Sequence, residues 1–204
     1  MIVIGLTGQT GAGKTTVAQM LGKLGCGIVN ADAVAREALA PGSECLSRLA
    51  ERFGKDIILE NGEADRKLIA SRAFADSGST RALGEITHPW IIRRTEEYLS
   101  ELRNNNYEAA VFDAPQLFES GGDRLCDVII AVTAPEKTRL ERVMQRDGIG
   151  ESAARLRMSA QHGEDFFRSR ADFVINGGMP RRDVRAAAAE IYKRVIKKDQ
   201  ATGG

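Results

Sequence analysis

The sequence predicts a three-layer α/β/α fold built on a five-stranded parallel sheet. Five short apolar runs rich in β-branched residues occur along the chain, and helical patterns separate them. The runs cover residues 2–6, 27–30, 109–112, 128–133 and 173–176. Because parallel neighbours need long connections, this alternation favours helices on both faces of the sheet with right-handed crossovers. Ligand-contacting side chains are then expected at the carboxyl ends of the strands.

The stretch between the second and third runs is too long for one crossover helix. It divides into four helical patterns, at residues 33–39, 44–53, 66–74 and 80–102. Local breaks are expected at Pro41-Gly42, Gly54, Asn61-Gly62, Ser77-Gly78 and Pro89. The simplest interpretation is a helical insertion, residues 33–107, within a single domain of residues 1–204.

A second polar helical segment, residues 136–170, is dense in arginine and is interrupted at Gly148-Ile149-Gly150. This pattern is typical of a helical lid.

Composition and charge indicate a globular protein whose ligand is held by a local site. Hydrophobic residues make up 43% and charged residues 28% of the chain, and the formal net charge is +1. The overall balance therefore predicts neither a nucleic-acid nor a membrane partner. The three cysteines are odd in number, far apart and in no C-x-x-C pair, which favours reduced thiols. The apolar run at residues 2–6 is too short for a signal peptide or a membrane span, so a cytoplasmic location is expected. No obligatory protein partner is expected either.

Residues 8–15, with the sequence GQTGAGKT, match the phosphate-loop pattern G-x-x-x-x-G-K-[ST]. The match stands directly after a predicted strand and directly before a predicted helix, which an accidental glycine-rich turn would not require. Glycines let successive backbone N–H groups point inward, and the helix N-terminus adds partial positive charge. The pattern predicts a P-loop NTPase-type fold that binds ATP and Mg²⁺. The expected nucleotide-binding residues are Gly11, Ala12, Gly13, Lys14, Thr15 and Thr16.

Two of these residues have specific expected roles. Lys14 is expected to reach the β- and γ-phosphates and to take part in catalysis, and the Thr15 hydroxyl is expected to bind Mg²⁺.

Two aspartates follow or end predicted strands and so are expected at the reactive edge of the sheet. Asp32 comes directly after the second strand and is the candidate that orients an acceptor hydroxyl and takes its proton. Its alternative role is to cap the helix that follows. Asp113 ends the third strand and either holds magnesium through water or caps a turn.

Arg142 and Arg146 lie four residues apart on one predicted helix and so project from the same face. They could close over the phosphates in the transition state, or they could belong to a solvated face paired with Glu141 or Asp147. For Trp90 and the Phe166-Phe167 pair, packing and an adenine-binding role are the alternatives. A lone histidine such as His88 is usually structural.

The ordered set of motifs resembles the dephospho-coenzyme A kinase family, within the P-loop nucleoside-monophosphate-type kinases, along most of the chain. The matching segments are Ile4-Gly5-Leu6-Thr7-Gly8 before the loop, Asn30-Ala31-Asp32 with Ala35-Arg36, Pro41-Gly42, Phe53-Gly54, Asn61-Gly62, Asp65-Arg66, His88-Pro89, residues 113–119, Arg142 with Gln145-Arg146-Asp147, Gln161 and residues 171–176. The loop alone is shared by many NTPases, whereas this order is specific.

The resemblance implies ATP-dependent phosphorylation of the ribose 3′-hydroxyl of dephospho-coenzyme A, the last step of coenzyme A synthesis. It implies that Asp32 is the catalytic aspartate and that Arg142 is a catalytic and nucleotide-binding lid arginine. Asn176 falls near the adenine side. The residues implied to bind the acceptor are Asp32, Arg36, Arg66, His88 and Asp113. The alternatives are another P-loop nucleoside or nucleotide kinase and, in a different class, a nucleotide-dependent switch ATPase.

Two positions depart from the family pattern. Asn30 stands where the family usually has aspartate, and Gln116 stands where it usually has leucine. If the first acid of the Asp-Ala-Asp triplet were the base, Asn30 could orient a hydroxyl but could not take its proton. Gln116 places an amide in an apolar stretch, so it is expected to meet a ligand or another polar partner.

Overall fold

The computed structural model describes residues 1–202, and side chains as far as residue 196. The described chain forms two compact units. One unit, here called the sheet unit, contains Met1–Val29 and the chain from Leu99 onward; the other, the helical unit, is Asn30–Tyr98. Residues 99–107, which sequence analysis assigned to the insertion, belong to the sheet unit, where Leu99 is buried.

The sheet unit contains the predicted five-stranded sheet, and the α/β fold class is confirmed. Its strands are β1 (Ile2–Gly8), β2 (Gly27–Asn30), β3 (Ala109–Asp113), β4 (Val128–Thr133) and β5 (Phe173–Asn176). Their spatial order is β2-β3-β1-β4-β5, and β1 pairs in parallel with both β3 and β4. The register sets Leu6 beside Asp113 and Thr133 beside Asn176, so the carboxyl ends of these strands meet at one edge.

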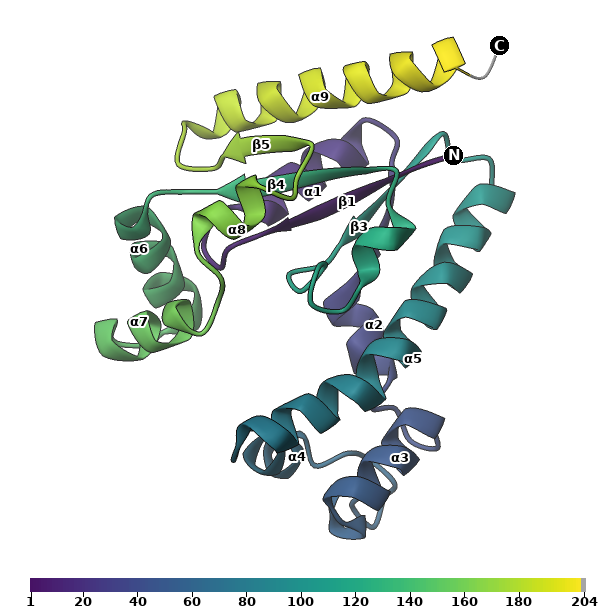
Figure 1. Ribbon diagram of the computed structural model, residues 1–204, viewed down its shortest axis with the longest axis vertical. Coiled ribbons are helices and arrows are strands. Elements are labelled where there is room, and N and C mark those ends of the chain that lie inside the picture. The colour runs from purple at the N-terminus through teal and green to yellow at the C-terminus, as the bar shows by residue number, and fades with distance from the viewer. Residues whose placement is uncertain (203–204) are drawn as a thin grey trace. The chain divides into compact units, whose positions relative to one another are not determined.

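Helices cover the sheet, as Figure 1 shows. On one face α1 (Lys14–Lys23) packs against α9 (Arg181–Thr202), and alternate side chains of the central strands form an apolar core with them. The short helix α8 (Glu164–Arg168) contacts β1 and β4, and its Phe167 is 2% exposed. The segment predicted as a lid forms α6 (Glu136–Asp147) and α7 (Glu151–Ser159), while η2 (Gly122–Leu125) is a short 3₁₀ turn.

The helical unit has its own apolar core. Its elements are α2 (Ala31–Glu37), α3 (Glu44–Phe53), η1 (Lys55–Ile57), α4 (Arg66–Ala73) and the first part of α5 (Ser77–Asn104). The buried residues of this core are Ala38, Cys45, Leu46, Leu49, Ala50, Phe53, Ile57, Ile69 and Ala73. Within the described residues, no helix combines the length and the apolar character needed to span a bilayer.

The expected break at Pro89 is wrong, because α5 runs through it without interruption. Proline removes one backbone N–H and leaves the carbonyl four residues earlier without its helical partner. Here Pro89 and Glu85 are both exposed, so that carbonyl faces water, which can hydrate it. The helix also begins earlier than expected, at Ser77, where Asp76 Oδ1 accepts a hydrogen bond from the Ser79 N–H at 2.8 Å.

Candidate active site

The glycine loop, residues 8–15, joins β1 to α1 in a conformation that requires glycine. Gly8, Gly11 and Gly13 have φ angles of 134°, 75° and 106°, where other residues are strained. A Cβ atom on Gly8 would overlap the backbone carbonyl of Val132 on β4. Gly13 precedes α1 without a side-chain cap, and the first turn of α1 carries no acidic residue. The N–H groups at this helix end are therefore suited to an anion.

The three residues after Gly13 place their side chains differently. Lys14 Nζ donates a hydrogen bond to the Gly8 carbonyl at 2.9 Å, so the ammonium group folds back over the loop. Thr15 is exposed in the first turn of α1, and Thr16 faces a cavity. A cation and hydroxyl groups thus surround the N-terminus of α1.

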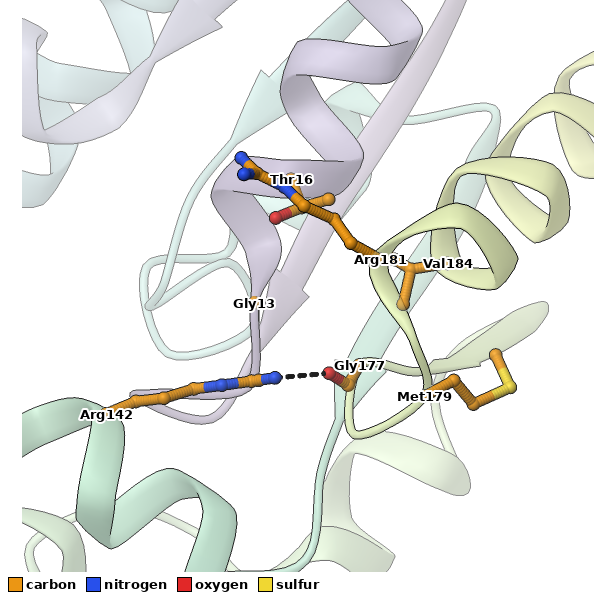
Figure 2. A pocket seen from close by; sticks show the side chains of 7 residues that line it. All are labelled: Gly13, Thr16, Arg142, Gly177, Met179, Arg181 and Val184. Atoms are coloured by element: carbon orange, nitrogen blue, oxygen red, sulfur yellow. Dashed lines mark hydrogen bonds between the residues drawn. The ribbon is translucent and has the colours of Figure 1, made fainter.

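Arg142 connects the glycine loop to the segment after β5. Its Nη1 atom donates to the carbonyl oxygens of Gly11 at 3.2 Å and Ala12 at 3.3 Å, and its Nη2 atom donates to Gly177 at 3.0 Å (Figure 2). Gly177 packs so tightly that a Cβ atom there would overlap the Ala12 carbonyl. One guanidinium therefore fixes two loops that lie far apart in sequence.

Beside this contact lies a cavity of about 300 Å³, shown in Figure 2. Its lining residues are Gly13, Thr16, Arg142, Gly177, Met179, Arg181 and Val184. Two guanidinium groups and two apolar side chains offer contacts to both the flat faces and the polar edges of a base. Asn176 holds the turn that carries Gly177, because its Oδ1 atom accepts a hydrogen bond from the Gly178 N–H at 2.9 Å.

Arg146 lies on the same helix and reaches a different part of the loop. Its Nη2 atom is 3.4 Å from Thr10 Oγ1, and its guanidinium also pairs with the Asp147 carboxylate at 2.7 Å. Arg157 of α7 contacts the same carboxylate. These hydrogen bonds and charges, Arg146 first, lower the pKa of Asp147 to about 2, so it is ionised at neutral pH. Asp147 joins α6 to α7, with Arg157 as a partner that sequence spacing did not reveal.

A second contact that sequence reasoning missed attaches the end of the lid segment to the loop. The Thr10 N–H donates to Gln161 Oε1 at 2.7 Å, and Gln9 Nε2 donates to the His162 carbonyl at 3.4 Å. Gln9 is only 4% exposed. Both contacts join residues more than 150 positions apart, which no local sequence pattern signals, so only the fold shows them.

In the helical unit, Asp32 lies exposed in the first turn of α2. The alternative that Asp32 caps this helix is wrong. The cap is Asn30, whose Oδ1 atom accepts a hydrogen bond from the Ala33 N–H at 2.9 Å, because the capping residue must precede the first helical residue. Asparagine serves here as well as aspartate, so the departure at Asn30 leaves the local structure intact. Arg36 Nε donates to the Asp32 carbonyl at 3.1 Å.

The other expected acceptor-binding residues lie on separate elements. Arg66 is the exposed first residue of α4, after its cap Asp65. His88 is half-buried on α5, with its ring against Gly84, where an added Cβ atom would lie 3.2 Å from Cε1. Asp113 ends β3 in the sheet unit, beside Leu6 of β1. The structure groups Asp32 with Arg36, and it holds Asp113 on the strand next to β1.

Gln116 does not need the ligand or partner that its apolar neighbours suggested. Its side chain is exposed in the segment after β3, so water solvates the amide. The three aromatic residues for which packing and adenine binding were the alternatives make packing contacts. Phe167 is buried, Trp90 packs against the helical unit's core, and Phe166 stacks on His162 with 3.7 Å between ring centroids.

The parallel α/β sheet and the glycine loop before α1 define a class of proteins suited to bind the phosphates of a nucleotide. The family model that matches residues 2–180 is that of dephospho-CoA kinase. A dephospho-CoA kinase of Anaeromyxobacter dehalogenans is 41% identical over 88% of this chain and 86% of its own. A dephospho-CoA kinase of Syntrophotalea carbinolica is 38% identical over 96% of this chain and 93% of its own. The solved dephospho-CoA kinase of Campylobacter jejuni has 25% identity and a TM-score of 0.72, covering 97% of this chain and 98% of its own.

The chain belongs to the dephospho-CoA kinase family. It is a phosphate-transferring enzyme that uses ATP as co-substrate and acts in coenzyme A biosynthesis, as the resemblance of its motifs implied.

Proposed function

We propose that the enzyme transfers the γ-phosphoryl group of ATP to the ribose 3′-hydroxyl of dephospho-coenzyme A. The glycine loop binds the phosphates through residues 11–16, with Lys14 on the β- and γ-phosphates. Asp32 orients the acceptor hydroxyl and takes its proton. Arg36, Arg66, His88 and Asp113 contribute to acceptor binding. The observation that carries the proposal is the uncapped N-terminus of α1, which follows a loop whose backbone conformation requires glycine at three positions.

The cavity beside Arg142 is proposed to hold the adenosine of ATP. Its volume of about 300 Å³ lies at the lower end of typical ligand pockets. Arg142 can stack on the base or neutralise phosphate charge while it holds both walls of the cavity. Asn176 contributes indirectly, because it shapes the turn that presents Gly177. A separate proposal is that Arg142 also stabilises the transition state, and the kcat of an Arg142 variant tests it.

Arg146 suits a phosphate-side role. Its contact with Thr10 Oγ1 places a positive charge over the first half of the loop. The ion pair with the Asp147 carboxylate holds the guanidinium there in the absence of a bound phosphate. A phosphate would then meet an arginine that is already oriented, which lowers the entropic cost of assembling the site.

Residues that fit Mg²⁺ are present in the sheet unit. The Thr15 hydroxyl is exposed at the start of α1, and the Asp113 carboxylate ends the strand next to β1. Both supply the hard oxygen ligands that Mg²⁺ accepts, Asp113 through water. When bound, the ion would neutralise phosphate charge. We propose further that the enzyme works in the cytoplasm, with no nucleic-acid, membrane or obligatory protein partner.

An acceptor panel tests this function. ADP formation is measured with dephospho-coenzyme A, uridine, cytidine, nucleoside monophosphates and no acceptor. We expect a clear preference for dephospho-coenzyme A and little turnover without acceptor. Equal rates on nucleosides would favour another nucleoside kinase of this fold, and full-rate hydrolysis without acceptor would favour a switch ATPase.

A further inference from the structure

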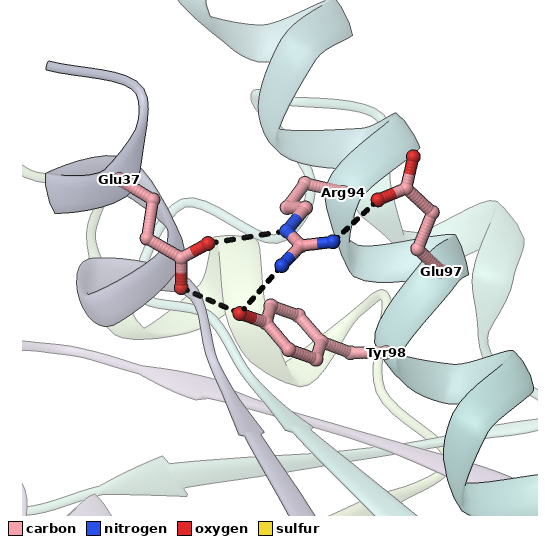
Figure 3. A network of polar contacts seen from close by, with 4 residues as sticks. All are labelled: Glu37, Arg94, Glu97 and Tyr98. Atoms are coloured by element: carbon pink, nitrogen blue, oxygen red, sulfur yellow. Dashed lines mark hydrogen bonds and ion pairs between the residues drawn. The ribbon is translucent and has the colours of Figure 1, made fainter. Parts of the chain in front are cut away.

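A compact polar network joins α2 to α5 within the helical unit (Figure 3). Glu37, the last residue of α2, accepts a hydrogen bond from Arg94 Nε at 3.1 Å and from the Tyr98 hydroxyl at 2.7 Å. Arg94 also donates from Nη1 to Glu97 at 2.6 Å and from Nη2 to the Tyr98 hydroxyl at 3.0 Å. Glu37, Arg94 and Tyr98 thus form a closed ring of three contacts.

The ring is better defined than an ordinary surface ion pair. Arg94 and Tyr98 are half-buried, and the Arg94 guanidinium lies 4.3 Å from the centroid of the Tyr98 ring. The Tyr98 hydroxyl accepts one hydrogen bond, from Arg94, and donates one, to Glu37, so the direction of each hydrogen bond in the network is fixed. The hydrogen bonds that Arg94 donates to Glu97, to Glu37 and to the Tyr98 hydroxyl raise the pKa of Arg94, and the hydrogen bond that Tyr98 donates to Glu37 raises the pKa of Tyr98. Arg94 therefore stays charged, and Tyr98 stays protonated, near neutral pH.

The helix that this ring holds is short and carries the proposed base. Helix α2 has seven residues and buries Val34 alone along its length. Helices of about two turns are not stable by themselves in water, so their position depends on tertiary contacts. Asp32 precedes Glu37 by five residues and projects about 140° away around the helix. Glu37 can consequently anchor α2 to α5 while Asp32 stays exposed.

We propose that Glu37, Arg94 and Tyr98 are positioning residues, which fix α2 on α5 so that Asp32 is held in one orientation. The inference rests on the proposed role of Asp32 as the base. None of the three has to touch substrate. Their effect on rate comes through the geometry of Asp32, because a displacement of about 1 Å of a reacting group can lower a rate up to about 100-fold.

The first test compares variants of the ring with a matched control. Glu37→Ala removes both acceptor oxygens, and Glu37→Gln keeps one of them. Tyr98→Phe keeps the aromatic side chain but removes its hydroxyl group. The control is Arg93→Met, which breaks the neighbouring ion pair from α5 to Glu44 of α3, at 3.2 Å. Purified full-length enzymes are assayed with dephospho-coenzyme A well below their melting temperatures.

Glu37→Ala should lower kcat about 10-fold, with KM for ATP changed less than about twofold. Glu37→Gln should recover most of the rate, and Tyr98→Phe should lose about threefold. Arg93→Met should match wild-type kcat. If Glu37→Ala fails to fold, Tyr98→Phe and Glu37→Gln provide the same comparison. If the Glu37 and Tyr98 variants have lower melting temperatures but wild-type kcat, the network has only a structural role and the proposal is overturned.

A double-mutant cycle separates this inference from the proposed function. If the ring acts through Asp32, Glu37→Ala should add less than about a twofold loss of kcat in an Asp32→Asn background. A full, additive loss would show that the ring acts by another route and would overturn the proposal. An Asp32→Asn enzyme with normal kcat would instead refute the base assignment itself, on which the inference depends.

Discussion

Replacing Arg142 with methionine tests how the enzyme builds its nucleotide site. Methionine keeps the unbranched stem but removes the guanidinium that donates to Gly11, Ala12 and Gly177. Hydrogen bonds from a charged donor contribute about 1.5–3 kcal/mol each. Because Arg142 is only half-buried and water can hydrate the released carbonyls, we expect about 2–3 kcal/mol in total rather than the full sum. The two loops that lose this stabilisation must then be ordered when ATP binds, and that cost corresponds to a reduction of about 30- to 150-fold in kcat/KM for ATP.

The assay is the initial rate of ADP formation against ATP concentration at saturating dephospho-coenzyme A. Lys137→Met, which removes one exposed positive charge from the same helix, should stay within about twofold of wild type. A rise in KM for ATP with kcat preserved would show that Arg142 acts in binding, whereas a fall in kcat would show a transition-state role. An Arg142→Met enzyme within threefold of wild type in kcat/KM would refute the reasoning.

Three further changes test other contacts. Gly177→Ala places a Cβ atom against the Ala12 carbonyl, so KM for ATP should rise about 10-fold or more with little change in KM for the acceptor; an unchanged KM would contradict the packing. Gln161→Ala releases the Thr10 N–H and should lower kcat/KM for ATP about fivefold, checked by steady-state kinetics against wild type. Burial raises the pKa of Cys126 to about 12 from an ordinary value of 9.0, so the folded state holds its proton more tightly than the unfolded chain. Stability from this thiol should therefore be complete below pH 9 and decline as pH rises toward 12; urea unfolding at pH 8 and pH 10.5 should show a smaller alkaline loss for Cys126→Ala than for wild type.

Much of the sheet unit follows from local sequence pattern. The five apolar runs gave the strands to within two residues at each end, because a strand buried in a parallel sheet needs continuous apolar character. The glycine loop was equally predictable, since its positive φ angles demand glycine at fixed spacing. Helix α3 was found at its observed bounds because its apolar residues recur at helical spacing and Gly54 follows it.

What the sequence could not supply were contacts between residues remote along the chain. The bond from Thr10 to Gln161 and the approach of Gly177 to Ala12 join segments more than a hundred residues apart, and no local pattern encodes such pairs. Pro89 failed as a signal because its cost depends on whether the freed carbonyl can reach water, which only the fold decides. For Asp32 the error was a shift of two residues, because the helix cap is Asn30.

The division of labour between phosphate binding and proton removal is tested most directly by Asp32→Asn. Single-turnover transfer to dephospho-coenzyme A and equilibrium binding of ATP are measured on the same preparation. Asparagine can still orient the hydroxyl but cannot accept its proton, so transfer should slow about 100-fold or more while the Kd for ATP stays within about threefold. Transfer at the wild-type rate by this variant would contradict the account.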